Sequence, residues 1–119
     1  MRKLDTVQKK YLLNHAYATD NPNHSGANHF YTVMDSEDKL IMGYIRFQQG
    51  ARSGTEPPNG LRDDDLLEIV RDRLKGFQKG PFPCEENEKA LKCVEEALGY
   101  LKKRTDDRAA RGVLGLEVK

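Results

Sequence analysis

The sequence has no tryptophan, no long apolar run and almost no excess of charge of either sign. A membrane-spanning helix needs about 20 consecutive apolar residues, and no stretch of the chain approaches that length. Lysine and arginine number 20 and aspartate and glutamate number 19, so the net charge is +1. A general DNA or RNA binder carries a clear basic excess, because phosphate neutralisation dominates its affinity. We therefore expect neither a membrane nor DNA among the partners.

Apolar residues and cysteines are also scarce. Only 37% of the residues are hydrophobic and 33% are charged, so one chain builds a thin core that partner chains could complete. The first residues, MRKLDTVQKK, lack the apolar segment of a signal peptide, and we expect the protein to stay in the cytoplasm where it is made. In that reducing compartment we expect Cys84 and Cys93 to be small buried hydrophobic residues rather than a disulfide.

Motifs for catalysis and metal binding are absent as well. The chain has no GxSxG, Walker or GxGxxG motif and no clear pair of catalytic carboxylates. His15, His24 and His29 lack the Cys/His or Glu/His spacing of a metal site. The three aspartates at 63–65 are better explained as a helix start, where acidic side chains favour the positive end of the helix dipole. The sequence therefore predicts no enzyme, no metal and no cofactor.

The N-terminal half has the patterns of β-structure. Residues 28–34 (NHFYTVM) and 39–49 (KLIMGYIRFQQ) are rich in aromatic and β-branched side chains, and the second run alternates with period two. The turn DSEDK between them predicts an antiparallel hairpin. We also expect a short helix over residues 4–17, because the apolar residues there have a loosely helical spacing.

The C-terminal half is predicted to be helical, after a Gly/Pro-rich connector over residues 50–60. The first helix begins within RDDDLLE, where Asp65 and Glu68 fit a capping box, and the glycines and prolines of KGPFP end it. The second helix begins at about Cys84 and is capped by Gly112. Apolar residues three and four apart mark one stripe on each helix: Leu66, Val70, Leu74 and Phe77 on the first, and Leu91, Val94, Leu98 and Leu101 on the second.

Together these elements predict an α+β fold in one domain, residues 1–119. A small N-terminal antiparallel β-sheet or hairpin lies within residues 1–60, and an αα-hairpin spans residues 61–112.

A basic cluster near the C-terminus is the main candidate site. It contains three arginines at spacings of four and three, which stack along one side of a helix: Arg104, Arg108 and Arg111, beside Lys102 and Lys103. Guanidinium groups in such a ladder suit bidentate contacts to phosphate. The alternative is structural, because basic residues also favour a helix C-terminus and Asp107 could pair with Arg104 or Arg111.

Two further residues have both a structural and a ligand-binding interpretation. Phe77, at the end of its helix, is either a core residue or a ring that stacks on a nucleobase. Asn87, in the first turn of the next helix, is either a neutral helical residue or an amide that contacts a base edge or a ribose hydroxyl. Asn87 and Arg104 lie roughly 25 Å apart along one helix. A small ligand reaches both only if an antiparallel copy of the helix lies alongside.

The order and spacing of several segments resemble those of a known family. From residue 28 onward the runs NHFYTV, IRFQQG, GFQ-GPF-C-EN-AL and RT-DR-RGV-G are similar to the phage Thoeris anti-defence proteins of the first described type. Those proteins share a helical-hairpin domain with the phage anti-CBASS sponges, and the resemblance covers about three-quarters of the chain.

The resemblance implies a fold, a function and an assembly. Members combine a small antiparallel sheet with two helices and form homo-oligomers, either dimers or hexamers. They are not enzymes: in the cytoplasm of the bacterial host they capture the cyclic ADP-ribose isomer that signals Thoeris immunity and hold it intact. Some members also bind cyclic di- or trinucleotides of CBASS defence at a separate site.

The resemblance also implies which residues bind the ligand. Phe77 would stack on adenine, Asn87 would make polar contacts, and Arg104, helped by Arg108, would pair with the pyrophosphate. Arg52 is a candidate for the oligonucleotide site. Two alternatives stay open at this stage: an enzyme that hydrolyses the same signal, and a small nucleic-acid-binding module that uses the terminal arginines.

Overall fold

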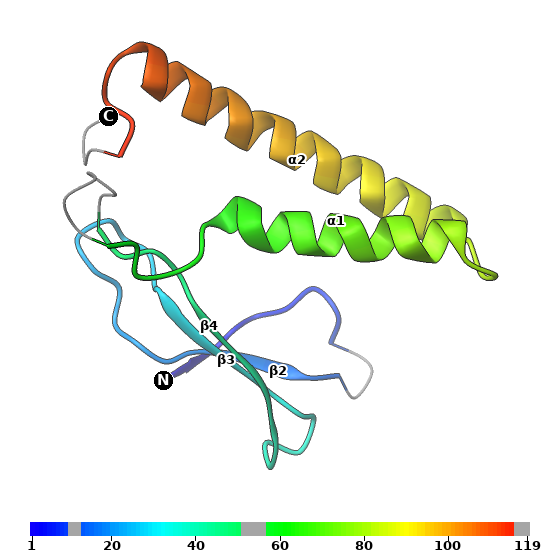
Figure 1. The fold of residues 1–119 in the computed structure, drawn as a ribbon. Coiled ribbons are helices and arrows are strands. Elements are labelled where there is room, and N and C mark those ends of the chain that lie inside the picture. Colours follow the sequence, from blue (N-terminus) through cyan, green and yellow to red (C-terminus); the bar gives the residue numbers. More distant parts are fainter. Residues whose placement is uncertain (10–12, 51–56, 116–119) are drawn as a thin grey trace. The chain divides into compact units, whose positions relative to one another are not determined.

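The computed structural model describes residues 1–9, 13–50 and 57–115. The chain forms two compact units: one comprises Met1–Gln49 with Asn59–Leu61, and the other comprises Gly50–Pro58 with Arg62–Lys119. The first holds a sheet and the second a pair of helices (Figure 1). The predicted α+β class, with a sheet followed by an αα-hairpin, is confirmed.

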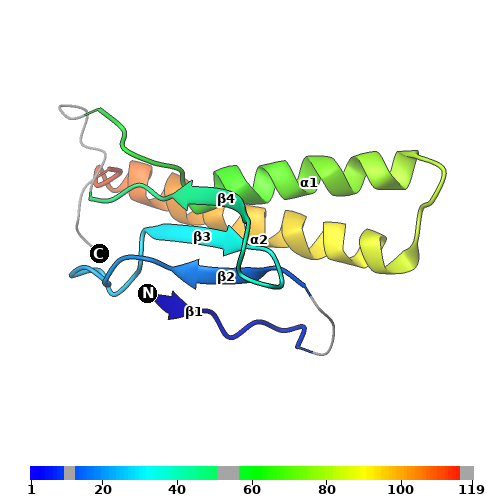
Figure 2. The same ribbon diagram turned by 90° about the horizontal axis from the view of Figure 1, so that it is seen from below.

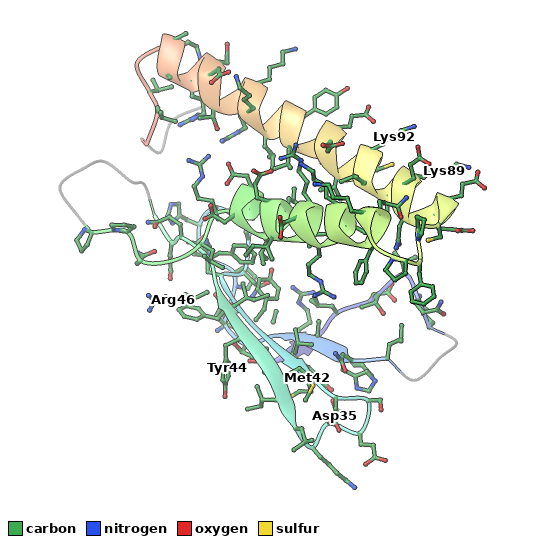
Figure 3. All side chains as sticks on the ribbon, turned by 45° about the vertical axis from the view of Figure 1, so that its right-hand side comes forward. Asp35, Met42, Tyr44, Arg46, Lys89 and Lys92 are labelled. Atoms are coloured by element: carbon green, nitrogen blue, oxygen red, sulfur yellow. The ribbon has the colours of Figure 1, made fainter. Side chains whose placement is uncertain are left out.

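The sheet has four antiparallel strands in the order β1-β2-β3-β4, side by side in Figure 2. Its register places Tyr17 of β2 opposite Thr32 of β3, and Thr32 opposite Tyr44 of β4. Tyr44 lies on β4 and is 73% exposed, and Figure 3 shows it projecting from that strand. The strands are β1 (Arg2–Lys3), β2 (His15–Ala18), β3 (Phe30–Met34) and β4 (Ile41–Arg46).

Sequence patterns predicted the β3–β4 hairpin correctly, but the helix expected over residues 4–17 is wrong. The described residues of that stretch contain no helix, and β2 begins within it at His15. The segment HAYA pairs along its length with β3, and Ala18 at its end is fully buried. A short helix is marginal by itself, so ladder hydrogen bonds from a neighbouring strand outweigh a loose helical spacing.

A polar cluster fixes the chain just before β3. The Asp20 carboxylate accepts hydrogen bonds from the backbone N–H of His29 at 3.0 Å and of Phe30 at 3.2 Å, and from the Asn28 amide at 3.2 Å. The Asn28 amide oxygen in turn accepts from Arg2 Nη2 at 2.8 Å. Burial raises the pKa of the Asp20 carboxyl, but the hydrogen bonds from His29, Phe30 and Asn28 outweigh it and hold that pKa below its ordinary value.

Asp20→Asn is expected to lower the thermal midpoint at neutral pH by about 5 °C, because a charged acceptor of several hydrogen bonds is lost. The pKa of Asp20 is lowered by folding, so its contribution is present above about pH 4 and is lost as the pH falls below that range. The difference in thermal midpoint between the variant and the wild type should therefore be smaller at acid pH. Thermal scans at pH 7 and pH 3 measure this difference. Asp5→Asn is the control, because Asp5 is exposed and forms a surface ion pair with Lys9 at 2.8 Å. Equal thermal midpoints of Asp20→Asn and the wild type at pH 7 would show that the Asp20 carboxylate does not stabilise the fold.

The second unit is an antiparallel pair of helices, α1 (Asp63–Lys79) and α2 (Glu85–Ala110). The expected capping box at Asp65 and Glu68 is wrong, since α1 begins two residues before Asp65 with Arg62 as its N-cap. The Asp65 carboxylate accepts the Arg62 backbone N–H at 2.8 Å. Arginine has no acceptor with which to complete a reciprocal box, so only half of that motif is present.

The two ends of α2 are held by local bonds. At its start, Cys84 Sγ accepts the Asn87 backbone N–H at 3.4 Å. At its end, Gly112 has a φ of 73° and donates to the Ala109 carbonyl, while Val113 donates to the Arg108 carbonyl at 2.9 Å. This pair of bonds is a Schellman motif, which confirms Gly112 as the cap.

Both cysteines are free, and both are exposed, which corrects the expectation that they are buried. Cys84 precedes α2 and accepts a hydrogen bond from its first turn. Cys93 lies outside the apolar stripe of α2, to which the partly covered Leu91 and Val94 belong. No helix in the described part of the chain is long and apolar enough to cross a bilayer.

Candidate functional site

Some cations of the basic cluster pair with acidic side chains of α2, and others have no such partner within the described residues. Lys102 bonds Asp106 at 2.5 Å, and Arg111 pairs with Asp107 at 3.4 Å. By contrast, the side chains of Lys103 and Arg104 are exposed and make no hydrogen bond or ion pair within the described part of the chain. The structural interpretation therefore accounts for Lys102 and Arg111, whereas the donors of the Arg104 guanidinium are unused within the described residues.

Arg108 has a structural contact that the sequence did not reveal. It is the buried residue of α2, with 8% of its surface exposed, and its guanidinium donates to the Val113 carbonyl at 3.1 Å. Its own carbonyl accepts the Val113 N–H, so Arg108 holds both polar groups of the residue that follows the helix cap. If Arg108 assists Arg104 in pairing with a pyrophosphate, as predicted, it has to do so while its guanidinium is bonded to the Val113 carbonyl.

Phe77 lies near the end of α1 and Asn87 lies in the first turn of α2, so both are close to the turn that joins the two helices. Phe77 is 49% exposed, and the Arg73 guanidinium carbon lies 5.3 Å from the centroid of its ring in a cation–π contact. Asn87 is half-buried in the first turn of α2, and its backbone N–H donates to Cys84 Sγ. An exposed ring and an amide at one end of a hairpin suit a base and its polar edge.

The other candidates lie elsewhere. Arg104 is near the opposite end of α2 from Asn87, a separation of roughly 25 Å in a continuous helix. One hairpin therefore keeps the predicted site residues apart. The sequence spacing had already indicated this separation. Arg52, the candidate for a separate oligonucleotide site, lies outside the described residues.

A groove of about 320 Å³ lies between the start of α1 and the C-terminal half of α2. Across it the Arg62 guanidinium donates to the Thr105 hydroxyl at 3.2 Å, and Arg62 Nε pairs with Asp64 Oδ1 at 3.2 Å. Sequence reasoning missed this bond, because its partners are 43 residues apart and no sequence pattern links them. The groove is lined by Arg62, Asp64, Glu68, Leu98, Lys102 and Thr105.

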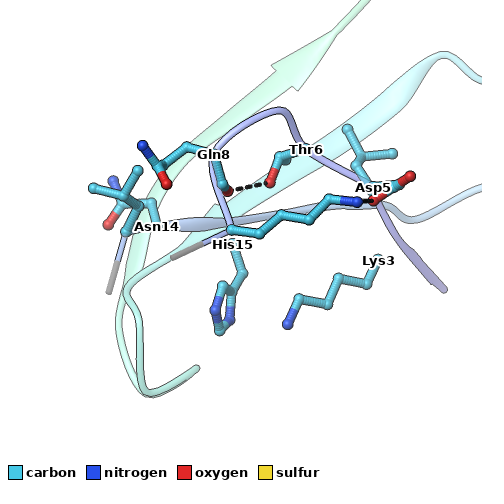
Figure 4. Close-up of a pocket in the computed structure, with 9 residues that line it drawn as sticks. Lys3, Asp5, Thr6, Gln8, Asn14 and His15 are labelled. Carbon is cyan, nitrogen blue, oxygen red and sulfur yellow. Dashed lines mark hydrogen bonds and ion pairs between the residues drawn. The ribbon is translucent and has the colours of Figure 1, made fainter. Parts of the chain in front are cut away.

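The sheet unit has a second hollow, of about 420 Å³, next to the start of β2. Figure 4 shows Lys3, Asp5 and His15 around it, and the Lys9 ammonium pairs with Asp5 at 2.8 Å. Within the described residues, none of the predicted ligand residues lines this hollow.

The helical hairpin identifies the family. The family model of the Acb2/Tad1 hairpin domain matches residues 42–106, more than half of the chain. The chain belongs to the Acb2/Tad1 family. The match begins in β4 and ends within α2, so it includes Phe77, Asn87 and Arg104 and stops short of Arg108. The resemblance found in the sequence is thereby confirmed.

A curated relative of this Acb2/Tad1 protein is named Thoeris anti-defense 1, from Bacillus phage SBSphiJ7. The two are 41% identical over 88 residues. The aligned region covers 74% of the present chain and 60% of the relative, so the chain spans less than two-thirds of the length of the protein it matches.

Proposed function

We propose that this Acb2/Tad1 family member is a phage anti-defence protein that acts against Thoeris immunity. It does so by binding the cyclic ADP-ribose isomer that serves as the immune signal and holding it unchanged. The relative named Thoeris anti-defense 1 supports the anti-Thoeris assignment. The observation that carries the ligand chemistry is the exposed Arg104, whose guanidinium makes no bond within the described residues.

Each candidate residue supplies a contact that this ligand class needs. The Arg104 guanidinium pairs with the pyrophosphate, for which its planar fork is suited. Phe77 stacks on adenine, a contact worth about 1–3 kcal/mol per base. The Asn87 side chain donates and accepts hydrogen bonds at the base edge or the ribose hydroxyls. None of these roles requires a bond of the ligand to break.

The separation of these residues requires a second copy of the chain. If two hairpins lie antiparallel, the turn end of one comes beside the far end of α2 in the other. Phe77 and Asn87 from one copy then face Arg104 from its partner, and a twofold dimer has two such sites. The exposed apolar residues of α1, among them Ile69 at 56% and Val70 at 42%, are consistent with an additional packing partner.

A trap works by affinity rather than by turnover. It has to bind the signal more tightly than the host receptor does, and each additional 1.4 kcal/mol of binding free energy gives a factor of ten. A pyrophosphate clamp combined with base stacking supplies such affinity in the host cytoplasm without a catalytic group. A separate site for cyclic di- or trinucleotides stays a prediction.

Incubation with the cyclic ADP-ribose isomer tests the proposal. The protein should deplete the free ligand in proportion to its own concentration, and heat denaturation should release a compound of unchanged mass and retention time on HPLC. The Arg104→Ala variant, treated in the same way, should deplete none. A product of altered mass would show that the signal is hydrolysed and would reject the trap.

A further inference from the structure

The two helices of the hairpin differ in length, which leaves part of α2 without support from α1. The 17 residues of α1 span about 26 Å, whereas the 26 residues of α2 span about 39 Å. Figure 1 shows α2 continuing past the first residue of α1. Arg104 lies where this extension begins, because its neighbour Thr105 contacts Arg62, the residue that caps α1.

Side-chain hydrogen bonds tie the helices together at three levels. Gln78 is bonded to the backbone of Cys84 at 3.1 Å beside the turn, and Arg71 Nε donates to Glu95 at 2.9 Å near the middle. The bond from Arg62 to Thr105 lies farthest from the turn of the three. It therefore holds the stretch of α2 from which the Arg104 side chain projects.

The Arg62 guanidinium has a partner on each helix. Its Nε forms an ion pair with Asp64 Oδ1 of α1 at 3.2 Å, and its Nη2 donates a hydrogen bond to the Thr105 hydroxyl of α2. Thr105 is partly buried, so water competes less for its hydroxyl than for that of an exposed residue. The result is a short chain of contacts from the Asp64 carboxylate to the residue next to Arg104.

We propose that Arg62 and Thr105 are positioning residues for the ligand-binding guanidinium of Arg104. Holding Thr105 fixes the rotation of α2 about its own axis at this turn. The direction in which Arg104 leaves the helix is then fixed too, because successive residues are set about 100° apart. A binding group needs such support to stay within a fraction of an ångström of its ligand. This inference rests on the proposed function, since it takes Arg104 as the residue that binds the pyrophosphate.

Two substitutions at Thr105 separate positioning from packing. Thr105→Val keeps the shape and removes the hydroxyl, so it should raise the Kd for the cyclic ADP-ribose isomer about tenfold, the equivalent of one net hydrogen bond. Thr105→Ser keeps the hydroxyl and should bind within about twofold of wild type. Arg62→Met removes the same bond from the other side. Combining it with Thr105→Val should give no further loss, as expected for partners in one contact.

Arg71→Met is the matched control, because it breaks the bond to Glu95 between the same helices at a distance from Arg104. It should lower the thermal midpoint without changing the Kd measured by calorimetry. Wild-type affinity in Thr105→Val overturns the inference, and so does an equal loss of affinity in Arg71→Met. A wild-type protein that binds no ligand overturns the proposed function itself, so the two failures are distinguishable.

Discussion

Replacing Arg104 with alanine is expected to abolish binding of the cyclic ADP-ribose isomer, raising the Kd about 100-fold or more. The guanidinium is the group that pairs with the pyrophosphate, and its loss leaves that charge unmatched within the site. The fold should not change, because the exposed Arg104 side chain makes no bond within the described part of the chain. The variant should therefore keep the circular dichroism spectrum, the thermal midpoint and the assembly size of the wild type.

Calorimetric titration measures this effect, and the same helix provides its control. Lys92 projects from α2 (Figure 3). Lys92→Ala removes one positive charge and breaks an exposed ion pair, to Glu88 at 3.6 Å. Its Kd should equal that of the wild type, which separates the local role of Arg104 from a change in net charge. Unchanged affinity in Arg104→Ala would defeat the assignment of this residue.

Most of the fold could be predicted because its signals are local. The runs FYTVM and IMGYIR are β-branched and aromatic with a turn between them, and the two long helices have acidic starts and Gly/Pro ends. Strand β2 could not be predicted in the same way. Its four residues carry little periodicity, and their conformation is decided by pairing with β3 across a loop.

The candidate site was only partly visible in the sequence, for a related reason. Spacing showed that several cations share one helix face, but not which of them already have a partner. The bond from the buried Arg108 to the Val113 carbonyl depends on the geometry of the helix cap, and the bond from Arg62 to Thr105 depends on how two helices align. The selection of Phe77, Asn87 and Arg104 came from the family resemblance, and their roles stay predictions.

Two inactive variants are expected to restore binding when they assemble together. Phe77→Ala/Asn87→Ala lacks the base-binding half of the proposed site, and Arg104→Ala lacks the phosphate-binding half. Each should bind no ligand alone. In a mixed dimer, one of the two sites receives Phe77 and Asn87 from one copy and Arg104 from the other, so that site is complete. Random assembly makes half of the dimers mixed, and the capacity should return to about one quarter of the wild-type value.

The measurement is the amount of cyclic ADP-ribose isomer retained after the two variants are unfolded together and refolded. Wild-type protein taken through the same cycle sets the full capacity, and each variant refolded alone sets the zero. If two copies of the hairpin build the site between them, the mixture retains about one quarter of the wild-type amount while neither variant retains any. A mixture that retains nothing, beside a wild type that recovers fully, would contradict a site shared between chains.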